Sequence, residues 1–239
     1  MGKMDLVRQL LELPDVYGST PLFAAVSSGR LDLVEFLVSE GVSINAENKT
    51  GDVALTVAIQ HNEYDIVDHL IKNGADTSRN SITLLVAASE GLDRIVRRLL
   101  QAGVKTESTV ASKLSPLMAA CKNGHLQVVK SLIECDVNLE AQDNQGFTAL
   151  MYAAQQGHFE VVELLVVNRV NVNAKSHLGE TSLYLAVGNK HLKVCVLLIA
   201  CKASIKCVAY HGSTPLHSFA ARGQIQMVKL AVKLGADVN

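Results

Sequence analysis

The sequence predicts an all-α protein in which one unit of two short helices is repeated along the chain. A leucine-centred pattern recurs every 33 residues, with one interval of 29. A second column, seven positions later, consists mostly of glycine. Hydrophobic residues make up 49% of the chain but aromatic residues only 4%, which suits a thin, repetitive core. The leucines are Leu22, Leu55, Leu84, Leu117, Leu150, Leu183 and Leu216, and the second column is Gly29, Asn62, Gly91, Gly124, Gly157, Lys190 and Gly223.

Each unit contains the same elements in the same order. Residues 148–156 place their apolar side chains on one helical face, and Thr148 supplies a hydroxyl that can cap the first turn. Gly157 then ends this inner helix, because glycine adopts the left-handed conformation at little cost. Residues 159–167 form a second, outer helix, and the alternating segment VNVNAKSHLG after it predicts a hairpin-like projection. The unit is therefore helix, turn, helix and hairpin.

The repeated residues resemble the ankyrin repeat. The segment GSTPLFAAVSSGRLDLVEFLVSEGVSINA at 18–46 and GSTPLH at 212–217 match that family's pattern. The resemblance implies a curved solenoid of stacked helix-turn-helix pairs with projecting β-hairpin loops. It also implies a protein-binding scaffold without catalysis.

The resemblance divides the chain into a partial leading repeat and seven full ones. Residues 1–14 resemble an outer helix only, and a short hairpin precedes the third full repeat. The last repeat ends in GADVN, so we expect the chain to continue or to be truncated there. The full repeats are 18–47, 51–80, 81–109, 113–142, 146–175, 179–208 and 212–239.

Residue types that often carry chemistry occupy repeated structural positions. His125, His158 and His191 lie 33 residues apart, so we interpret them as hydrogen-bonding between neighbouring turns, and His217 receives a similar interpretation. Cys121 and Cys195 fall in columns of small apolar residues, which predicts burial without a disulfide or metal. The sequence holds no C-x-x-C pair, phosphate-binding loop or nucleophile elbow. We therefore expect no catalytic residue, no metal site and no cofactor.

Positions that vary between repeats are the candidates for partner binding, because the shared columns build the core. In the resembled family these positions are the hairpin tips and the last two residues of the inner helix. We prefer Phe147, Tyr210, His211 and Arg222 as anchors, since aromatic residues and arginine dominate interfaces. A solvated turn residue without a partner remains an equal alternative for any one of them. The candidates are Lys49, Asp52, His61, Lys122, Asn144, Gln145, Phe147, Gln155, Gln156, His177, Tyr210, His211 and Arg222.

The charge pattern favours a protein or peptide partner over nucleic acid. The net charge is −1, and no basic stripe is present. Residues 1–119 carry a net −4 and residues 120–239 a net +3, which suits a partner of opposite polarity along its length. No apolar run is long enough for membrane insertion, and no signal peptide opens the chain, so we expect a cytoplasmic, alternatively nuclear, monomeric array. The alternative function is an ankyrin segment of a larger signalling protein, such as a kinase, a ubiquitin-ligase adaptor or a channel.

Some positions depart from the repeat pattern and predict local weakness. Val53 and Ile82 stand where a threonine should cap the inner helix, at the junction that also has the short hairpin. Asp136, Arg169 and Lys202 replace the glycine that ends the outer helix, at a cost of roughly 1 kcal/mol each if they become left-handed.

Overall fold

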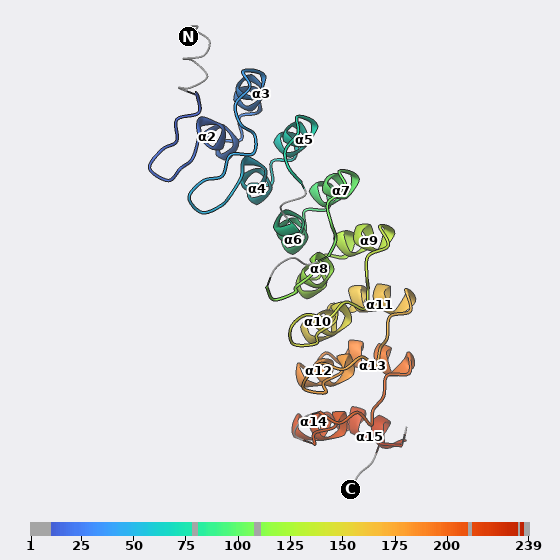
Figure 1. The fold of residues 1–239 in the computed structure, drawn as a ribbon. Coiled ribbons are helices and arrows are strands. Elements are labelled where there is room, and N and C mark those ends of the chain that lie inside the picture. Colours follow the sequence, from blue (N-terminus) through green and yellow to red (C-terminus); the bar gives the residue numbers. More distant parts are fainter. Residues whose placement is uncertain (1–10, 78–80, 108–110, 210–211, 234, 237–239) are drawn as a thin grey trace. The chain divides into compact units, whose positions relative to one another are not determined.

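The structure is a series of helix pairs (Figure 1). It is a computed structural model that describes residues 11–77, 81–107, 111–209, 212–233 and 235–236. The chain forms two compact units, Met1–Ala87 with Leu92–Thr106 and Ala88–Gly91 with Glu107–Asn239. Among the described residues, every helix is too short or too polar to span a bilayer.

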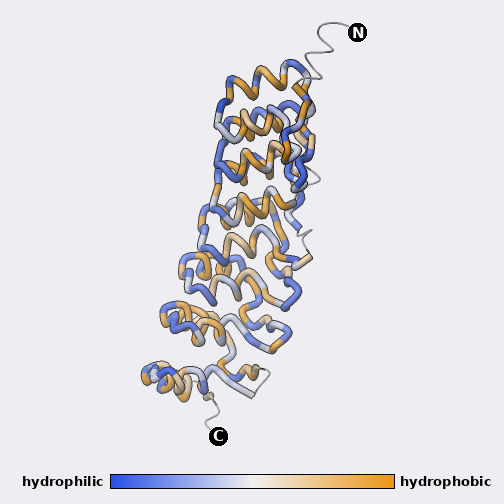
Figure 2. The backbone as a smooth tube through the Cα atoms, turned by 90° about the vertical axis from the view of Figure 1, so that its left-hand side faces the viewer, coloured by the Kyte–Doolittle hydropathy of each residue, from blue (hydrophilic) through white to orange (hydrophobic). Residues whose placement is uncertain are grey.

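Each unit has a layer of inner helices and a layer of outer helices (Figure 1). The first unit contains α2 (Pro21–Ser27) with α3 (Leu31–Ser39), α4 (Ala54–Gln60) with α5 (Tyr64–Lys72), and α7 (Asp93–Gln101) with all but the last two residues of α6 (Ser81–Ser89). The second unit contains α8 (Pro116–Asn123) with α9 (Leu126–Glu134), α10 (Ala149–Gln156) with α11 (Phe159–Val167), α12 (Ser182–Gly188) with α13 (Leu192–Ala200), and α14 (Pro215–Ala221) with α15 (Ile225–Lys233). Figure 2 shows hydrophobic residues along the helices and hydrophilic ones gathered in the turns.

The segments between helix pairs are tight loops, and none of their described residues forms a strand. Several loops are closed by two main-chain hydrogen bonds, as where the Asp143 N–H donates to Phe147 O at 3.1 Å and the Gly146 N–H donates to Asp143 O at 3.0 Å. A single main-chain hydrogen bond can link successive loops, as when the His177 N–H donates to Gln145 O at 2.9 Å. The expected hairpin projections are therefore turns held by isolated hydrogen bonds.

The repeated leucine column forms the centre of the core. Leu22, Leu55, Leu84, Leu117, Leu150 and Leu183 are buried, as predicted. Leu216 is only half-buried, so the prediction is wrong for this member. Phe219 stands in a column that holds alanine elsewhere, and its ring is fully buried.

Hydroxyl side chains cap several inner helices. The Oγ1 atoms of Thr148, Thr181 and Thr214 each accept a hydrogen bond from a backbone N–H in the first turn. Val53 stands at the N-cap of α4 without a side-chain cap, as the sequence predicts. The prediction for Ile82 is wrong, because α6 begins at Ser81 and places Ile82 inside its first turn. The expected cap defect is therefore confirmed at Val53, while the residue before α6 lies outside the described residues.

Three outer helices end with a non-glycine residue in the left-handed region. Asp136, Arg169 and Lys202 have φ angles of 55°, 60° and 66°, where the equivalent Gly41 has 81°. A side chain in this conformation costs about 1–2 kcal/mol, because its Cβ crowds the following carbonyl. The structure confirms that these residues adopt the strained turn.

We expect Arg169→Gly and Lys202→Gly each to raise the free energy of unfolding by about 0.5–1 kcal/mol, since the flexibility of glycine in the unfolded chain offsets part of the relieved strain. Urea denaturation of each variant measures the change. Lys206→Gly is the control, because Lys206 is an exposed loop residue whose φ is not positive. A similar gain in the control variant would contradict the explanation by strain.

Charged side chains join the outer helices α5 and α7. Asp68 accepts hydrogen bonds from Lys72 Nζ at 2.7 Å and from Arg98 Nε at 2.6 Å. These hydrogen bonds hold the pKa of Asp68 below its ordinary value, and the bond from Lys72 has the largest effect. The Arg94 guanidinium also lies over the Tyr64 ring, 3.6 Å from its centroid. The outer face of these helices is therefore occupied by internal contacts.

Candidate protein-binding surface

One polar column closes the loops that carry the predicted tip residues. Asp15, Asn48 and Asp143 each accept two backbone hydrogen bonds through Oδ1, from N–H groups two and four residues ahead. Ser176 accepts the equivalent pair through Oγ. A short polar side chain at this position replaces the backbone partners that a tight turn leaves open. The tips are therefore preorganised.

Some predicted partner-binding residues already form hydrogen bonds within their own loop or to the preceding loop. Lys49 Nζ donates to Val16 O at 2.9 Å, and Asn144 Nδ2 donates to Ala111 O at 2.5 Å. The Asp52 carboxylate accepts from Thr50 Oγ1 at 2.6 Å. These internal bonds limit the hydrogen bonds that the three side chains can offer to a partner.

The three spaced histidines link neighbouring repeats, as predicted. Nε2 of His125, His158 and His191 donates to the carbonyl oxygens of Ser89, Lys122 and Gln155 at 2.8, 3.0 and 3.0 Å. Each acceptor lies near the end of the preceding inner helix, where carbonyl groups lack helical partners. His217 instead forms a capping box with Thr214. All four contacts are structural.

Most remaining candidates lie exposed on inner-helix ends and loop tips. Lys122, Gln145, Gln156, His177 and Arg222 are exposed, and Gln155 is half-buried. His61 is exposed as well, and its Nδ1 donates to Val57 O of its own helix at 2.9 Å. We call the surface made by these helix ends and loop tips the inner surface.

Phe147 does not belong to the inner surface, which corrects its choice as an anchor. Its side chain is only 8% exposed and packs with Met151 and Leu185. Its ring centroid lies 5.3 Å from that of Tyr152. Phe147 lies between Gly146, which turns the chain, and Thr148, which caps α10, and this position directs its ring toward the core. Tyr210 and His211 lie outside the described residues.

Tyr152 is an inner-helix residue that sequence reasoning missed. Its hydroxyl donates to Asp143 Oδ2 at 2.6 Å, and the Lys122 ammonium lies 5.7 Å from its ring centroid. Burial, followed by the hydrogen bond and charge of Asp143, raises the pKa of Tyr152 well above its ordinary value. The available signal was an aromatic residue inside an otherwise alanine-rich helix.

Three of the five cysteines are buried packing residues. All five are free thiols, and Cys121, Cys195 and Cys207 are buried. Burial raises the pKa of Cys195 to about 12, so this thiol stays protonated at neutral pH. Within the described part of the chain, no group of three histidine, cysteine or acidic residues is placed to hold a metal.

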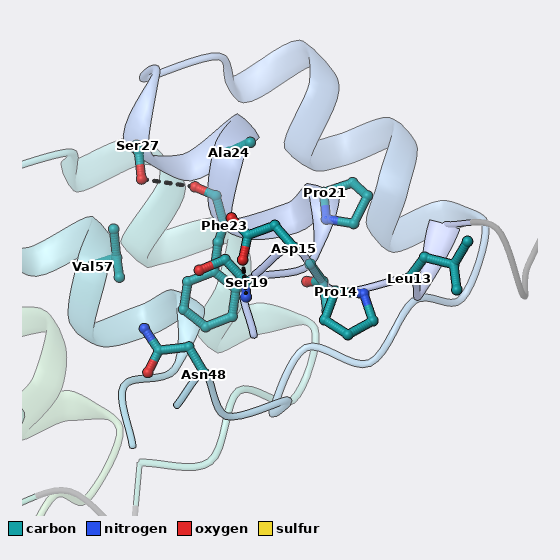
Figure 3. A pocket seen from close by; sticks show the side chains of 11 residues that line it. Leu13, Pro14, Asp15, Ser19, Pro21, Phe23, Ala24, Ser27, Asn48 and Val57 are labelled. Carbon is teal, nitrogen blue, oxygen red and sulfur yellow. Dashed lines mark hydrogen bonds between the residues drawn. The ribbon is translucent and has the colours of Figure 1, made fainter. Parts of the chain in front are cut away.

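A pocket opens on the inner surface of the first unit, where the sequence marked no candidate. Its volume is about 530 Å³, and its lining comes from the loop before α2, from α2 itself, and from Asn48 and Val57 of the next repeat. Figure 3 shows Pro14, Pro21 and Phe23 around the pocket, with Asp15 and Ser19 joined by a hydrogen bond. We call this cavity the Phe23 pocket.

The repeat pattern and its stacking contacts agree with a family comparison. A family model described as ankyrin repeats (3 copies) matches residues 1–81, 84–176 and 162–239. The chain is an ankyrin-repeat protein. A search of curated proteins found no match.

Membership in the family gives the coarse function of the chain. Ankyrin repeats are generally protein–protein interaction modules and are typically non-catalytic.

Proposed function

We propose that this ankyrin-repeat protein binds a protein or peptide through its inner surface, and that the Phe23 pocket receives an apolar side chain of that partner. The observation that carries this proposal is the pocket itself. A volume of about 530 Å³ falls within the range of small binding sites, and the lining combines apolar walls with a few polar groups.

One polar group in the pocket, the side-chain amide of Asn48, can recognise a peptide main chain. Asn48 Oδ1 is already occupied by hydrogen bonds from residues 50 and 52 of its own loop. Among the described residues, no acceptor takes a hydrogen bond from Asn48 Nδ2, so this donor is free to meet a peptide carbonyl. An apolar side chain with an adjacent carbonyl therefore matches the pocket.

Exposed apolar residues beside the pocket extend the same surface. Leu13, Val16 and Tyr17 are 60%, 76% and 72% exposed. Apolar residues gathered at one place on a surface mark interaction sites, and tyrosine is among the usual binding anchors. A partner seated in the pocket would cover them.

Ala24→Arg tests the proposal by filling the pocket. Ala24 is an exposed lining residue in a helix, and arginine is a good helix former, so the fold should be retained. The probe is a displayed library of random 12-residue peptides selected on the whole chain. We expect the enriched peptides to share an apolar anchor and to lose at least about tenfold in affinity for the variant, the effect of about 1.4 kcal/mol.

The matched control is Ser39→Arg, which adds the same charge to an exposed position of α3 outside the pocket. Peptides that bind the wild-type chain should bind this variant unchanged. Enriched peptides that bind Ala24→Arg as well as the wild type would refute the pocket as the binding site.

A further inference from the structure

The outer face of α13 differs from those of the other outer helices. The helix LKVCVLLIA contains one charged residue, Lys193. Leu192 and Val196 are 46% and 52% exposed, and Ala200 is exposed one further turn along. Residues four apart share a helix face, so these three form one continuous apolar stripe.

Val196 occupies a position that carries a charged residue in all six of the other full repeats. Alignment of the outer helices places it with six charged residues of both signs. An exposed valine at a position that otherwise carries a charge points to a surface that is covered in the working protein. The other members are Glu35, Asp68, Arg97, Lys130, Glu163 and Lys229.

A shallow apolar cleft accompanies the stripe. It lies between α11 and α13 and has a volume of about 530 Å³. Its lining is apolar apart from Lys193, which contributes its alkyl chain. The lining residues are Phe159, Leu192, Lys193, Val196, Leu197 and Ala200.

The two neighbouring helices carry opposite charges. Figure 1 shows α11, α13 and α15 in succession in the outer layer of the second unit. The only charged residues of α11 are Glu160 and Glu163, and those of α15 are Lys229 and Lys233. All four are exposed, and in the described part of the chain none of them forms an ion pair. The apolar stripe therefore has an acidic border and a basic border.

We propose that this face binds a second copy of the same chain. Consider a twofold axis that lies in the plane of contact and runs parallel to α13. Rotation about this axis places α13 of one copy against α13 of the other, and α11 of each copy opposite α15 of the other. Glu163 and Lys229 occupy the same column, so this rotation sets Glu163 against Lys229 of the second copy, twice. An in-plane axis perpendicular to α13 would instead set like charges together. The surface is therefore self-complementary in one orientation.

The available area makes the dimer weak. Three helices of nine residues, each about 13 Å long and about 10 Å apart, offer about 400 Å² per copy. Stable interfaces bury about 800 Å² per partner, so we expect a dissociation constant on the order of 100 µM. Such a dimer forms only at high local concentration, which departs from the monomeric array expected from the sequence.

Sedimentation equilibrium of the whole chain, from about 5 to 500 µM, tests the proposal over the range set by this affinity. We expect a reversible monomer–dimer equilibrium.

Val196→Glu restores the charge of the column and should weaken dimerisation by at least about tenfold. Its circular dichroism and melting temperature should match the wild type, because six other repeats carry a charge there. Phe36→Glu is the matched control, since Phe36 is 54% exposed on the outer helix α3 and is not a member of the stripe.

A charge exchange tests the orientation. Glu163→Lys and Lys229→Glu should each weaken the dimer, and the double variant should restore it, because the exchange preserves the opposed pair. A wild-type chain that stays monomeric at the highest concentration refutes the proposal and leaves the stripe to an amphipathic helix of another protein. Equal weakening by Phe36→Glu, or no rescue in the double variant, refutes it as well. None of these results depends on the Phe23 pocket.

Discussion

Gly157→Ala is expected to lower the free energy of unfolding by about 3 kcal/mol, because two costs meet at this position. Gly157 has a φ of +80°, a conformation that costs a side chain about 1–2 kcal/mol. A Cβ there would also lie 2.6 Å from Cγ of the His191 ring. The ring would have to move, and its 3.0 Å hydrogen bond to Gln155 O would be lost, at about 1 kcal/mol.

Gly223→Ala separates the two costs. Gly223 ends the inner helix α14 at the equivalent position with a φ of +66°, but a Cβ there would meet no atom within 4 Å. This variant should lose only the conformational part, about 1–2 kcal/mol. Urea denaturation of both variants gives the comparison. Adding His191→Ala to Gly157→Ala should cost less than the sum of the single losses, since the clash is then removed. Equal losses at the two glycines would show that the histidine ring contributes nothing.

The repeated columns could be predicted from the sequence because stacking fixes their environment. A histidine one residue after the inner-helix stop meets the preceding repeat in the same way each time. The spacing of His125, His158 and His191 therefore predicted a contact between turns, which the structure confirms. The close approach of each ring to the preceding glycine is a three-dimensional relation that no single-repeat pattern contains.

Side-chain direction at the variable positions could not be predicted in the same way. Phe147 is a loop aromatic by position, yet its ring packs on Leu185 of the following repeat. Ile82 aligned with the capping column, but α6 starts at Ser81 and extends past it. In both cases neighbouring elements decide the outcome, and the local sequence does not record them.

The Phe23 pocket was missed for a related reason. Its apolar walls combine Pro14, Phe23 and Val57, which come from three separate segments. Each residue alone matches an ordinary loop or core position in the repeat. The exposed Leu13, Val16 and Tyr17 were the usable signal, since three large apolar side chains close together in a loop are uncommon on a surface.

Asp143→Ala is expected to destabilise the second unit by about 3 kcal/mol, because one buried carboxylate satisfies three donors. Oδ1 accepts from the Gln145 and Phe147 N–H groups at 2.8 and 2.9 Å, and Oδ2 accepts from the Tyr152 hydroxyl at 2.6 Å. Asp143 is 8% exposed, so water cannot replace all three bonds without opening the loop. The Phe147 and Tyr152 rings would lose their support at the same time.

Asp15→Ala and Asp143→Asn are the matched variants, and melting and urea curves measure all three. Asp15 accepts the same two backbone bonds but is exposed, so water substitutes for it and the loss should be about 1 kcal/mol. In Asp143→Asn the side-chain amide keeps an oxygen for the backbone donors, and its NH₂ group can donate to the tyrosine oxygen, so this variant should also lose only about 1 kcal/mol.

The order of the three losses in unfolding free energy shows which property of Asp143 stabilises the loop. If Asp143→Asn is as damaging as Asp143→Ala, the negative charge and not the acceptor geometry holds the loop. If Asp143→Ala costs no more than Asp15→Ala, burial adds nothing, and the turn geometry alone fixes the tips of the inner surface.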